Sequence, residues 1–227
     1  MTLCQPDGHS VAMSQLSERR LEERERRRLD ILDAAEAVAG VVGIEAMTME
    51  QVARKARLSR ALLYVYFKDK PDLLVGLCLR ALQQLQQRFV ETSAAHTRGL
   101  AQVEACGRAY VAYAHEFPVR FEALAHFEAH TPGGDHDPAY EELLAAGDRT
   151  QAVIAQAIGQ GMHDGSIRND VGSPVLLGFT LWGLMHGLIQ LTVKKSGGLE
   201  REGISADALI EQGFRLALSA LAHPAGS

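Results

Sequence analysis

Apolar positions recur every three or four residues along most of this 227-residue chain, and this spacing predicts helices. No convincing run of alternating apolar and polar residues predicts a strand. The first repeat lies around residues 31–42 and can end at Gly43 as a C-cap. A longer repeat starts at Asp69 and continues for about six turns to Phe89. The pattern therefore predicts an all-α protein.

Breaks rich in glycine, proline and small polar residues divide the remainder into five further predicted helices. Their approximate ranges are 100–116, 118–130, 138–163, 174–194 and 205–222. The last two are apolar on more than one face, so each needs cover on several sides. A four-helix bundle formed with the same two helices of a second copy would supply that cover. We therefore expect a homodimer through the last two helices.

Residues 47–74 carry the signals of two short helices joined by a tight turn, followed by the start of a third. Thr48 can cap the first helix, with Gln51 as the reciprocal partner in a capping box. Ser59 can cap the second helix, and Asp69 can cap the third. These signals predict a helix-turn-helix.

The pattern within this segment separates an apolar interior from a basic exterior. The positions that can be buried together are Val52, Ala53, Ala56, Leu58, Leu63 and Phe67. The positions left for the outside are Arg54, Lys55, Arg57, Arg60 and Lys68. A second helix of about two turns that offers its N-terminus to solvent suits docking in a DNA major groove.

The charge distribution supports this interpretation, although the net charge of −5 alone argues against nucleic-acid binding. Residues 19–70 hold 12 Lys or Arg against 9 Asp or Glu, a net of +3, which leaves 11 against 19, or −8, for the rest. We therefore predict three regions: a disordered tail at 1–18, a DNA-binding domain at 19–68 and a larger helical domain at 69–227. The mixed-charge run at 17–30 is either a solvated helix face or an arm that lies on phosphates.

The cysteines and the hydropathy pattern indicate a soluble, cytoplasmic chain without a membrane partner. The three cysteines are an odd number at no metal-like spacing, and two lie inside apolar helical patterns. No stretch reaches the roughly 18 uninterrupted apolar residues of a membrane span. The N-terminus is polar and lacks the apolar run of a secretory signal.

The helix-turn-helix segment resembles the TetR family of bacterial transcriptional regulators. The family's capping Thr, A-x-x-S turn and Tyr-x-Tyr/His-Phe helix before a Lys match Thr48, residues 56–59 and the run from Tyr64 to Lys70. The sequence LWGLMHGLIQL at 181–191 is similar to the Trp-and-His-Gly helix of one C-terminal subclass, and HEFPVRF at 115–121 also fits that subclass.

The resemblance implies a homodimer of helical subunits, each with a three-helix DNA-binding head and a C-terminal domain for dimerisation and ligand binding. It implies a repressor more often than an activator. Arg57 departs from the family, because the turn position is often glycine, so the backbone either avoids positive φ or accepts strain. Val65 departs too, since a polar or aromatic residue is frequent there.

We expect the DNA contacts to come from the helix-turn-helix, at Thr48, Arg57, Ser59, Arg60, Ala61, Leu62, Tyr64, Tyr66 and Lys70. Arg60 could pair with guanine, and Ala61 or Leu62 could meet a thymine methyl group. The two tyrosines and the lysine would hold phosphates and set the register, although the tyrosines could instead only pack. Thr48 could add a phosphate contact to its capping role or serve as a cap alone.

Aromatic residues and histidines of the larger domain are candidates for lining a ligand pocket, although such a stripe is more often plain core. They are Tyr110, Tyr113, Phe117, Phe121, His126, Phe127, Trp182 and His186. Glu122, His126 and His130 recur every four residues and could present a metal site. Exposed or hydrogen-bonded histidines near a loop are commoner, so we expect no metal and no other cofactor.

The function expected from these features is a dimeric repressor that binds a palindromic operator and is released by a small-molecule effector. The alternative is a DNA-binding regulator of the same fold that a partner protein or its own concentration controls, and a filled C-terminal core would favour it. An enzyme is not expected. The sequence has no G-x-S-x-G elbow, no phosphate-binding glycine loop and no HExxH motif.

Overall fold

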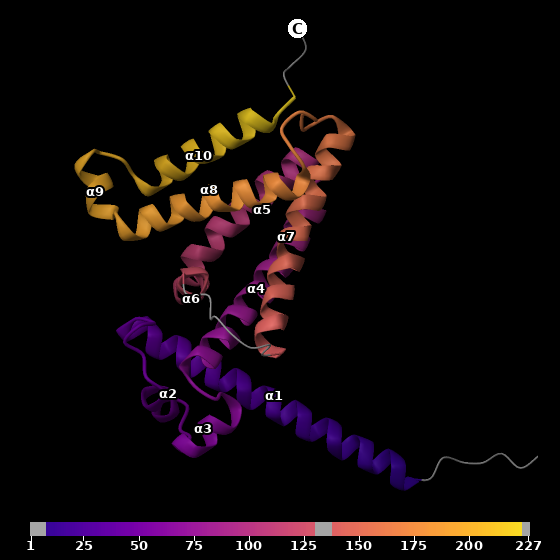
Figure 1. Cartoon of the computed structure of the whole chain (residues 1–227), viewed down its shortest axis with the longest axis vertical. Helices are drawn as coiled ribbons and strands as arrows, with labels where there is room; N and C mark the ends of the chain where they lie inside the picture. The colour runs from indigo at the N-terminus through magenta and orange to yellow at the C-terminus, as the bar shows by residue number, and fades with distance from the viewer. Residues whose placement is uncertain (1–7, 130–137, 224–227) are drawn as a thin grey trace, which may run out of the picture. The chain divides into compact units, whose positions relative to one another are not determined.

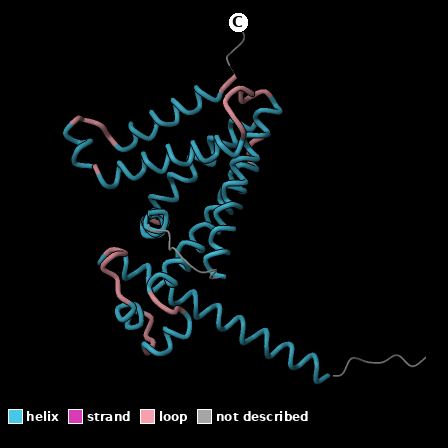
Figure 2. The backbone as a smooth tube through the Cα atoms, viewed as in Figure 1, coloured by secondary structure: helices cyan, strands magenta, loops and turns pink. Residues whose placement is uncertain are grey.

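The computed structural model describes residues 8–129 and 138–223, with side chains described at 18–127 and 138–223. These residues form ten helices joined by loops and turns (Figures 1 and 2). Strand pairing in the described ranges is limited to an isolated bridge between Ile167 and Ala222. The predicted all-helical fold is confirmed.

The chain divides into two compact units, residues Met1–Leu77 and Cys78–Ser227. The division falls inside helix α4 (Lys70–Ala94), whereas the sequence-based domain boundary lies between residues 68 and 69. The two units are described separately below.

The first unit contains α1 (Gly8–Val42), α2 (Met49–Lys55), α3 (Arg60–Tyr66) and the start of α4. Both directions of the predicted capping box form. The backbone N–H of Gln51 donates to Thr48 Oγ1 at 3.3 Å. The backbone N–H of Thr48 donates in return to the side-chain oxygen Oε1 of Gln51 at 2.8 Å. Ser59 Oγ accepts from Leu62 N at 3.2 Å. The predicted caps of α2 and α3 are therefore confirmed.

Helix α4 also begins as expected, with Asp69 as its cap. Its Oδ1 accepts from Asp72 N at 2.8 Å, and Pro71 lies in the first turn, where no backbone donor is needed. The C-cap at the end of α1 is Gly43, whose φ of +82° is the left-handed conformation typical of that position.

The N-terminal part of α1 differs from the tail expected at residues 1–18. Helix α1 begins at Gly8, so the described part of that segment is helical, and residues 1–7 lie outside the described residues. Figure 1 shows the N-terminal part of α1 extending away from α2 and α3. Opposite charges four residues apart, as at Glu22 and Arg26, support helix where the side chains have no core to cover.

The core of the first unit is formed by one face of α1 together with α2, α3 and the start of α4. Fully buried members include Ile31, Ala35, Ile44, Met47, Val52, Leu63, Phe67, Leu73 and Leu77. Ala56 and Leu58 are half-buried, so they contribute less to the core than their spacing predicts. Arg54, Lys55, Arg57, Arg60 and Lys68 are all exposed, as expected.

The second unit contains the rest of α4 and six further helices. These are α5 (Gly99–Glu116), α6 (Pro118–Ala129), α7 (Pro138–Asp164), α8 (Pro174–Lys194), α9 (Ser196–Arg201) and α10 (Ala206–Leu221). The five predicted helices agree with α5, α6, α7, α8 and α10 to within a residue or two. The short helix α9 lies where the sequence indicates only a loop, because its glycines at 197 and 198 lower helix propensity.

Close backbone approach joins α5 to α7 at one end of this unit. A Cβ atom added at Gly99 would lie 2.0 Å from the backbone nitrogen of Gly161, so the contact requires glycine. The Gly99 amide nitrogen also donates to Asp164 Oδ2 at 2.8 Å. Hydrogen bonds from Ser166 and from that amide lower the pKa of Asp164 to about 2.

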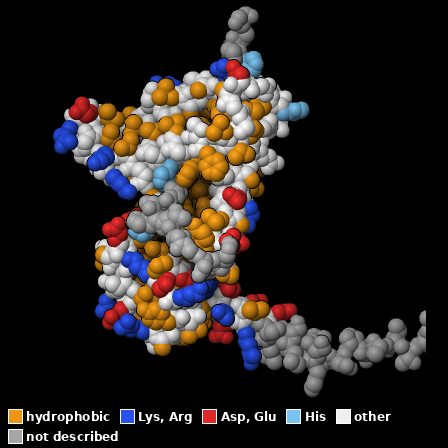
Figure 3. All heavy atoms as spheres, viewed as in Figure 1, with side chains coloured by type: hydrophobic (Ala, Val, Ile, Leu, Met, Phe, Trp, Pro, Cys, Tyr) orange, Lys and Arg blue, Asp and Glu red, His pale blue; other side chains and the backbone are white. Residues whose placement is uncertain are grey.

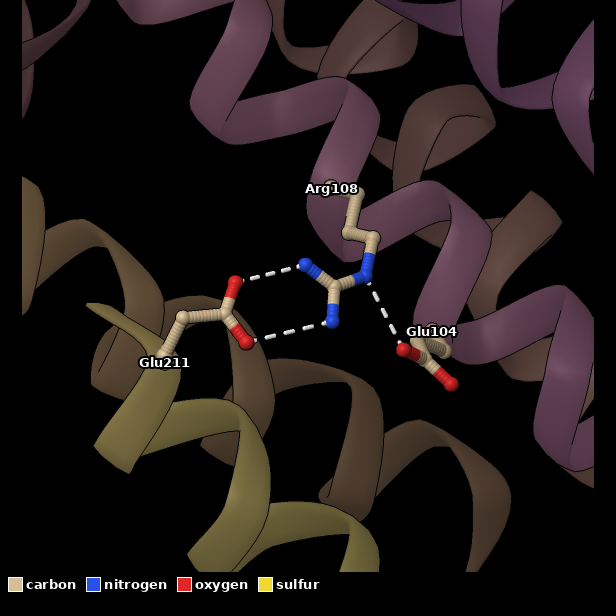
Figure 4. Close-up of polar contacts among 3 residues, drawn as sticks. All are labelled: Glu104, Arg108 and Glu211. Carbon is tan, nitrogen blue, oxygen red and sulfur yellow. Dashed lines mark hydrogen bonds and ion pairs between the residues drawn. The ribbon is translucent and has the colours of Figure 1, made fainter. Parts of the chain in front are cut away.

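Helix α10 is attached to α5 through Arg108, as Figure 4 shows. The guanidinium donates to Glu211 on α10 at 2.7 and 3.3 Å and to Glu104 on α5 at 2.9 Å. Arg108 also covers the ring of Phe214, with 4.6 Å between its Cζ atom and the ring centroid. These bonds raise the pKa of Arg108 and lower that of Glu211, so both groups stay charged.

Helix α8 is the most apolar helix of the second unit. It is long and apolar enough to cross a membrane by length and composition alone, with a mean hydropathy of 1.4 in its most apolar window, but only 22% of that window is buried. Apolar side chains also lie on the surface of α10, and Figure 3 shows such side chains gathered over this pair of helices. A large part of the α8 surface therefore has no cover within one chain.

Candidate DNA-reading surface and effector cavity

Helix α3 combines a buried anchor with an exposed N-terminal face. Leu63 and the C-cap Phe67 are fully buried and fix the helix against its neighbours. The residues that open the helix, Ser59, Arg60, Ala61 and Leu62, are all exposed, and so is Val65 one turn later. This arrangement leaves a short helix end available to enter a DNA groove.

Arg57 shows how the turn before α3 is made without glycine. Its φ is +57°, a left-handed conformation that costs an L-residue roughly 1–2 kcal/mol. The backbone is held there by two hydrogen bonds, from Arg57 N to Arg54 O at 3.2 Å and from Leu58 N to Ala53 O at 2.9 Å. Of the two alternatives raised by the sequence, the turn takes the strained one.

Two of the expected phosphate-contact residues already have partners within the first unit. Lys70 Nζ donates to the Glu45 carbonyl oxygen at 2.6 Å, which leaves its other two protons for a further acceptor. Thr48 Oγ1 donates to Gln51 Oε1 at 3.1 Å, so a phosphate contact from this hydroxyl would have to replace that bond.

The tyrosines of α3 differ in exposure. Tyr64 has 44% of its surface exposed, whereas Tyr66 is half-buried. Arg60 lies 3.8 Å from Glu50 on α2, but both side chains are largely exposed, so this pair is weak and leaves Arg60 able to turn toward another partner.

The second unit contains a cavity of about 260 Å³ between α4, α5, α6, α7 and α8. Its aromatic lining consists of Phe89, Tyr110, Phe127, Phe179 and Trp182. Its aliphatic lining consists of Leu82, Leu85, Val103, Leu124, Leu143, Leu144, Ile154, Leu181 and Met185. An apolar cavity of about 150 Å³ can hold benzene, so this volume admits a ligand of two fused rings or similar size.

Of the eight residues expected to line a pocket, the structure places Tyr110, Phe127 and Trp182 on this cavity. His186 and Phe121 lie behind it. The Tyr110 hydroxyl is hydrogen-bonded to His186 Nδ1 at 2.8 Å, and the rings of His186 and Phe121 stack with centroids 5.0 Å apart. Burial lowers the pKa of His186, which favours the neutral form of this imidazole.

Tyr113 and Phe117 belong to a different cluster and do not line the cavity. The Phe117 ring faces the guanidinium groups of Arg88 and Arg120, at 5.3 and 4.4 Å from its centroid. The Tyr113 hydroxyl donates to Gln84 Oε1 at 3.4 Å, and Arg120 also donates to that oxygen. These two aromatic side chains therefore stabilise the packing where α5 meets α6. His126 is half-buried and also lies outside the lining.

Polar lining residues on α7 were not anticipated from the sequence. They are Asp148, Thr150 and Gln151. Gln151 Oε1 is buried without a hydrogen-bond partner, whereas Thr150 Oγ1 donates to Ala146 O at 2.8 Å. A run of polar residues near the middle of a long helix whose neighbours are apolar is the signal that could have indicated them.

Cys106 also lines the cavity, and burial raises the pKa of its thiol to about 11. No lysine, arginine or histidine from the described residues contributes to the lining. The cavity wall is therefore apolar with a small polar edge on α7.

The metal site considered from the sequence involves His130, which lies outside the described residues. Within the described ranges, no three His, Cys, Asp or Glu side chains are grouped as metal ligands.

Two segments of the chain match family descriptions. Residues 31–77 match the bacterial regulatory proteins of the tetR family, and residues 103–216 match the tetracyclin repressor-like C-terminal domain. The chain belongs to the TetR family of transcriptional regulators, which are DNA-binding proteins and not enzymes. The resemblance inferred from the helix-turn-helix is confirmed for the family, and the Trp-and-His-Gly subclass remains a prediction.

Individual relatives agree with this assignment. The HTH-type transcriptional repressor KstR of Mycolicibacterium smegmatis is 37% identical over 79 residues, which cover 35% of this chain and 39% of that protein. The chain thus matches well under half of KstR's length.

Solved structures share the whole fold. A Rhodococcus sp. RHA1 protein of unknown function aligns with a TM-score of 0.70 at 20% identity, covering 87% of this chain and 96% of that one. The regulator FadR of Bacillus subtilis, solved in complex with stearoyl-CoA, aligns with a TM-score of 0.65 at 16% identity, covering 85% and 98%.

Proposed function

We propose that this chain is a dimeric, cytoplasmic repressor that binds a palindromic operator and leaves it when an apolar small molecule occupies the cavity of the second unit. The observation that carries the proposal is the cavity of about 260 Å³, because a filled core would instead favour control by a partner protein or by concentration. The name of KstR, a transcriptional repressor, supports the repressor part of the proposal.

The head of each subunit would read DNA through the N-terminus of α3. Arg60 would donate to guanine, and Ala61 or Leu62 would contact a thymine methyl group. Ser59 would lie in the groove beside these residues. The phosphate backbone would be held by Tyr64, Tyr66 and Lys70, with Thr48 as a further donor, and Arg57 would add a positive charge at the DNA surface. The exposure of the first turn of α3 and of Tyr64 supports these roles. Thr48 and Lys70 would contribute less, because each already has a hydrogen-bond partner within the first unit.

The dimer would form through α8 and α10. Leu176 and Leu216 are 61% and 60% exposed in the single chain, and such exposure of large apolar side chains on adjacent helices favours burial against a second copy. In a dimer of this kind the two heads could present α3 to successive major grooves, about 34–36 Å apart.

The effector would be uncharged over the part that enters the cavity, because the described lining offers no cation to a carboxylate or phosphate. Helix α4 belongs to both units, so a shift of this helix at the cavity would also move its N-terminal end in the DNA-binding unit. Leu82, Leu85 and Phe89 line the cavity, and the same helix continues into the core of the first unit at Leu73 and Leu77. Effector and operator would oppose each other reciprocally.

The test begins with selection of bound duplexes from a random pool, which gives the operator. Operator affinity is then measured by fluorescence anisotropy with a panel that contains naphthalene, 2-naphthol and long-chain alcohols, and with stearoyl-CoA for comparison. At least one apolar compound should lower the affinity about tenfold or more. If none does, the inducible reading fails and control by a partner or by concentration takes its place.

A cavity-filling variant sharpens this experiment. A Cβ at Gly147 would have 4.0 Å to its nearest neighbour, Leu82 on the opposite wall, so Gly147→Leu should occupy the cavity and abolish the response while operator binding persists. Gly159→Leu is the matched control, because it makes the same change on α7 outside the lining.

A further inference from the structure

Three arginines form a stripe along the N-terminal part of α1. Arg20, Arg24 and Arg28 are spaced four residues apart, so they share one face of the helix. Ile31 and Ala35 continue the same face and are fully buried in the core of the first unit. The stripe is therefore the outward extension of the face with which α1 covers that core.

The charges of this segment are segregated around the helix. All four glutamates of this segment, Glu18, Glu22, Glu23 and Glu25, lie about 100° or more around the helix from the middle of the stripe, and Arg19 and Arg26 lie on the side opposite it. Residues 18–26 are all exposed. Among the described residues, no carboxylate pairs with Arg20 or Arg24. A face of uniform positive charge remains open to solvent.

The stripe starts beside the expected DNA-contact residues. Arg28 lies over the Phe67 ring, with 4.6 Å between its Cζ atom and the ring centroid, and Phe67 directly follows Tyr66 at the end of α3. From there to Arg20 the helix rises about 12 Å. Positive charge thus continues from the C-terminal end of α3 along α1 and away from the head.

This arrangement is unfavourable in a free helix and favourable beside a polyanion. Like charges four residues apart destabilise a helix by a few tenths of a kcal/mol per pair. Burial in the apolar core does not offset this repulsion at Arg20 or Arg24, because both side chains are exposed. Duplex DNA carries a regular row of phosphates whose condensed counterions are released when arginines replace them.

We propose that Arg20 and Arg24 bind the phosphate backbone of the duplex just outside the base pairs read by α3. The inference rests on the proposed function, since it requires an operator. It assigns to the extension of α1 a second, sequence-independent contact that lengthens the footprint of each subunit.

The experiment compares the full chain with the double variant Arg20→Gln plus Arg24→Gln on two duplexes. One duplex ends at the edges of the selected operator, and the other carries about ten further base pairs on each side, enough for the roughly 30 Å length of helix before Arg28. The variant should bind the long duplex roughly tenfold more weakly and the short one almost unchanged. Its salt dependence on the long duplex should also be shallower by up to about 3.6 in log–log slope, because a dimer loses four phosphate contacts at roughly 0.9 each.

Arg19→Gln plus Arg26→Gln is the matched control, because it removes the same charge from the same segment on the other side of the helix. Glutamine and arginine have similar helix propensities, and circular dichroism of both variants verifies the helix content. The control should bind both duplexes with the affinity of the wild-type protein.

Equal losses in the two double variants would mean general electrostatic attraction and would overturn the stripe as a contact surface. Loss in neither variant would leave the segment a solvated helix face and would overturn it too. A chain that selects no DNA sequence at all would overturn the proposed function, a result distinct from both.

Discussion

At the scale of single residues, Arg57 combines a costly backbone conformation with an exposed basic side chain next to α3. An arginine in the left-handed backbone conformation persists only where the surrounding structure holds it there. At Arg57 the backbone hydrogen bonds of the turn do so. The strain and the charge at this position can be separated by substitution, because glycine removes both while alanine removes only the charge.

Arg57→Gly should therefore raise the free energy of unfolding by about 0.5–1 kcal/mol, since glycine adopts positive φ without strain but loses more entropy on folding. The same change should weaken operator binding several-fold through the lost cation. Arg57→Ala should weaken binding equally without the gain in stability. Urea unfolding and anisotropy measure the two effects, and equal stability of the two variants would contradict the role given to φ.

Asp164 allows a prediction about pH at the same scale. Its folded-state pKa of about 2 lies below the usual value of about 3.9, so the ionised carboxylate stabilises the fold at neutral pH. That contribution is complete above about pH 4 and is lost as the pH falls toward 2. The difference in melting temperature between the unchanged chain and Asp164→Asn should shrink to nothing over this interval. A constant difference from pH 7 to pH 2 would exclude the carboxylate as its source.

At the scale of elements, the contact of α5 with α7 depends on the absence of side chains. Gly99→Ala should lower the free energy of unfolding by about 3 kcal/mol, because its Cβ atom would overlap the backbone of Gly161 and force the helices apart. Gly159→Ala on α7 is the control, since its Cβ would meet nothing closer than 4.0 Å and should be neutral or slightly stabilising. Similar losses in both variants would contradict a specific contact.

The elements themselves were largely predictable from the sequence, because their limits depend on local chemistry. Thr48, Ser59 and Asp69 each cap a helix through a bond to a residue three positions away, and such bonds can be read from spacing alone. The cavity was less predictable. Its lining depends on which faces of five helices converge, so Phe117, bracketed by two arginines, could not be told from Phe127, which lines the cavity.

At the scale of the whole molecule, the exposed apolar face of α8 and α10 is the surface through which we propose that two copies pair. Leu216→Lys should give a folded monomer, since the side chain is already 60% exposed, and operator affinity should fall at least about tenfold when the two heads are no longer joined. Val90→Lys changes an exposed apolar residue on α4 and should leave the dimer intact. Sedimentation velocity reports the assembly state, and a dimeric Leu216→Lys protein would place the interface elsewhere.

If α8 and α10 pair two copies as proposed, the incomplete burial of α8 has a genetic consequence. A copy that lacked a working head would still carry the same pairing helices, so it would combine with intact copies. Each mixed dimer would contain only one DNA-binding unit able to recognise an operator half-site. A cell that carries both alleles would then express the regulated genes even though it still makes intact protein, and defects in the head would behave as dominant mutations.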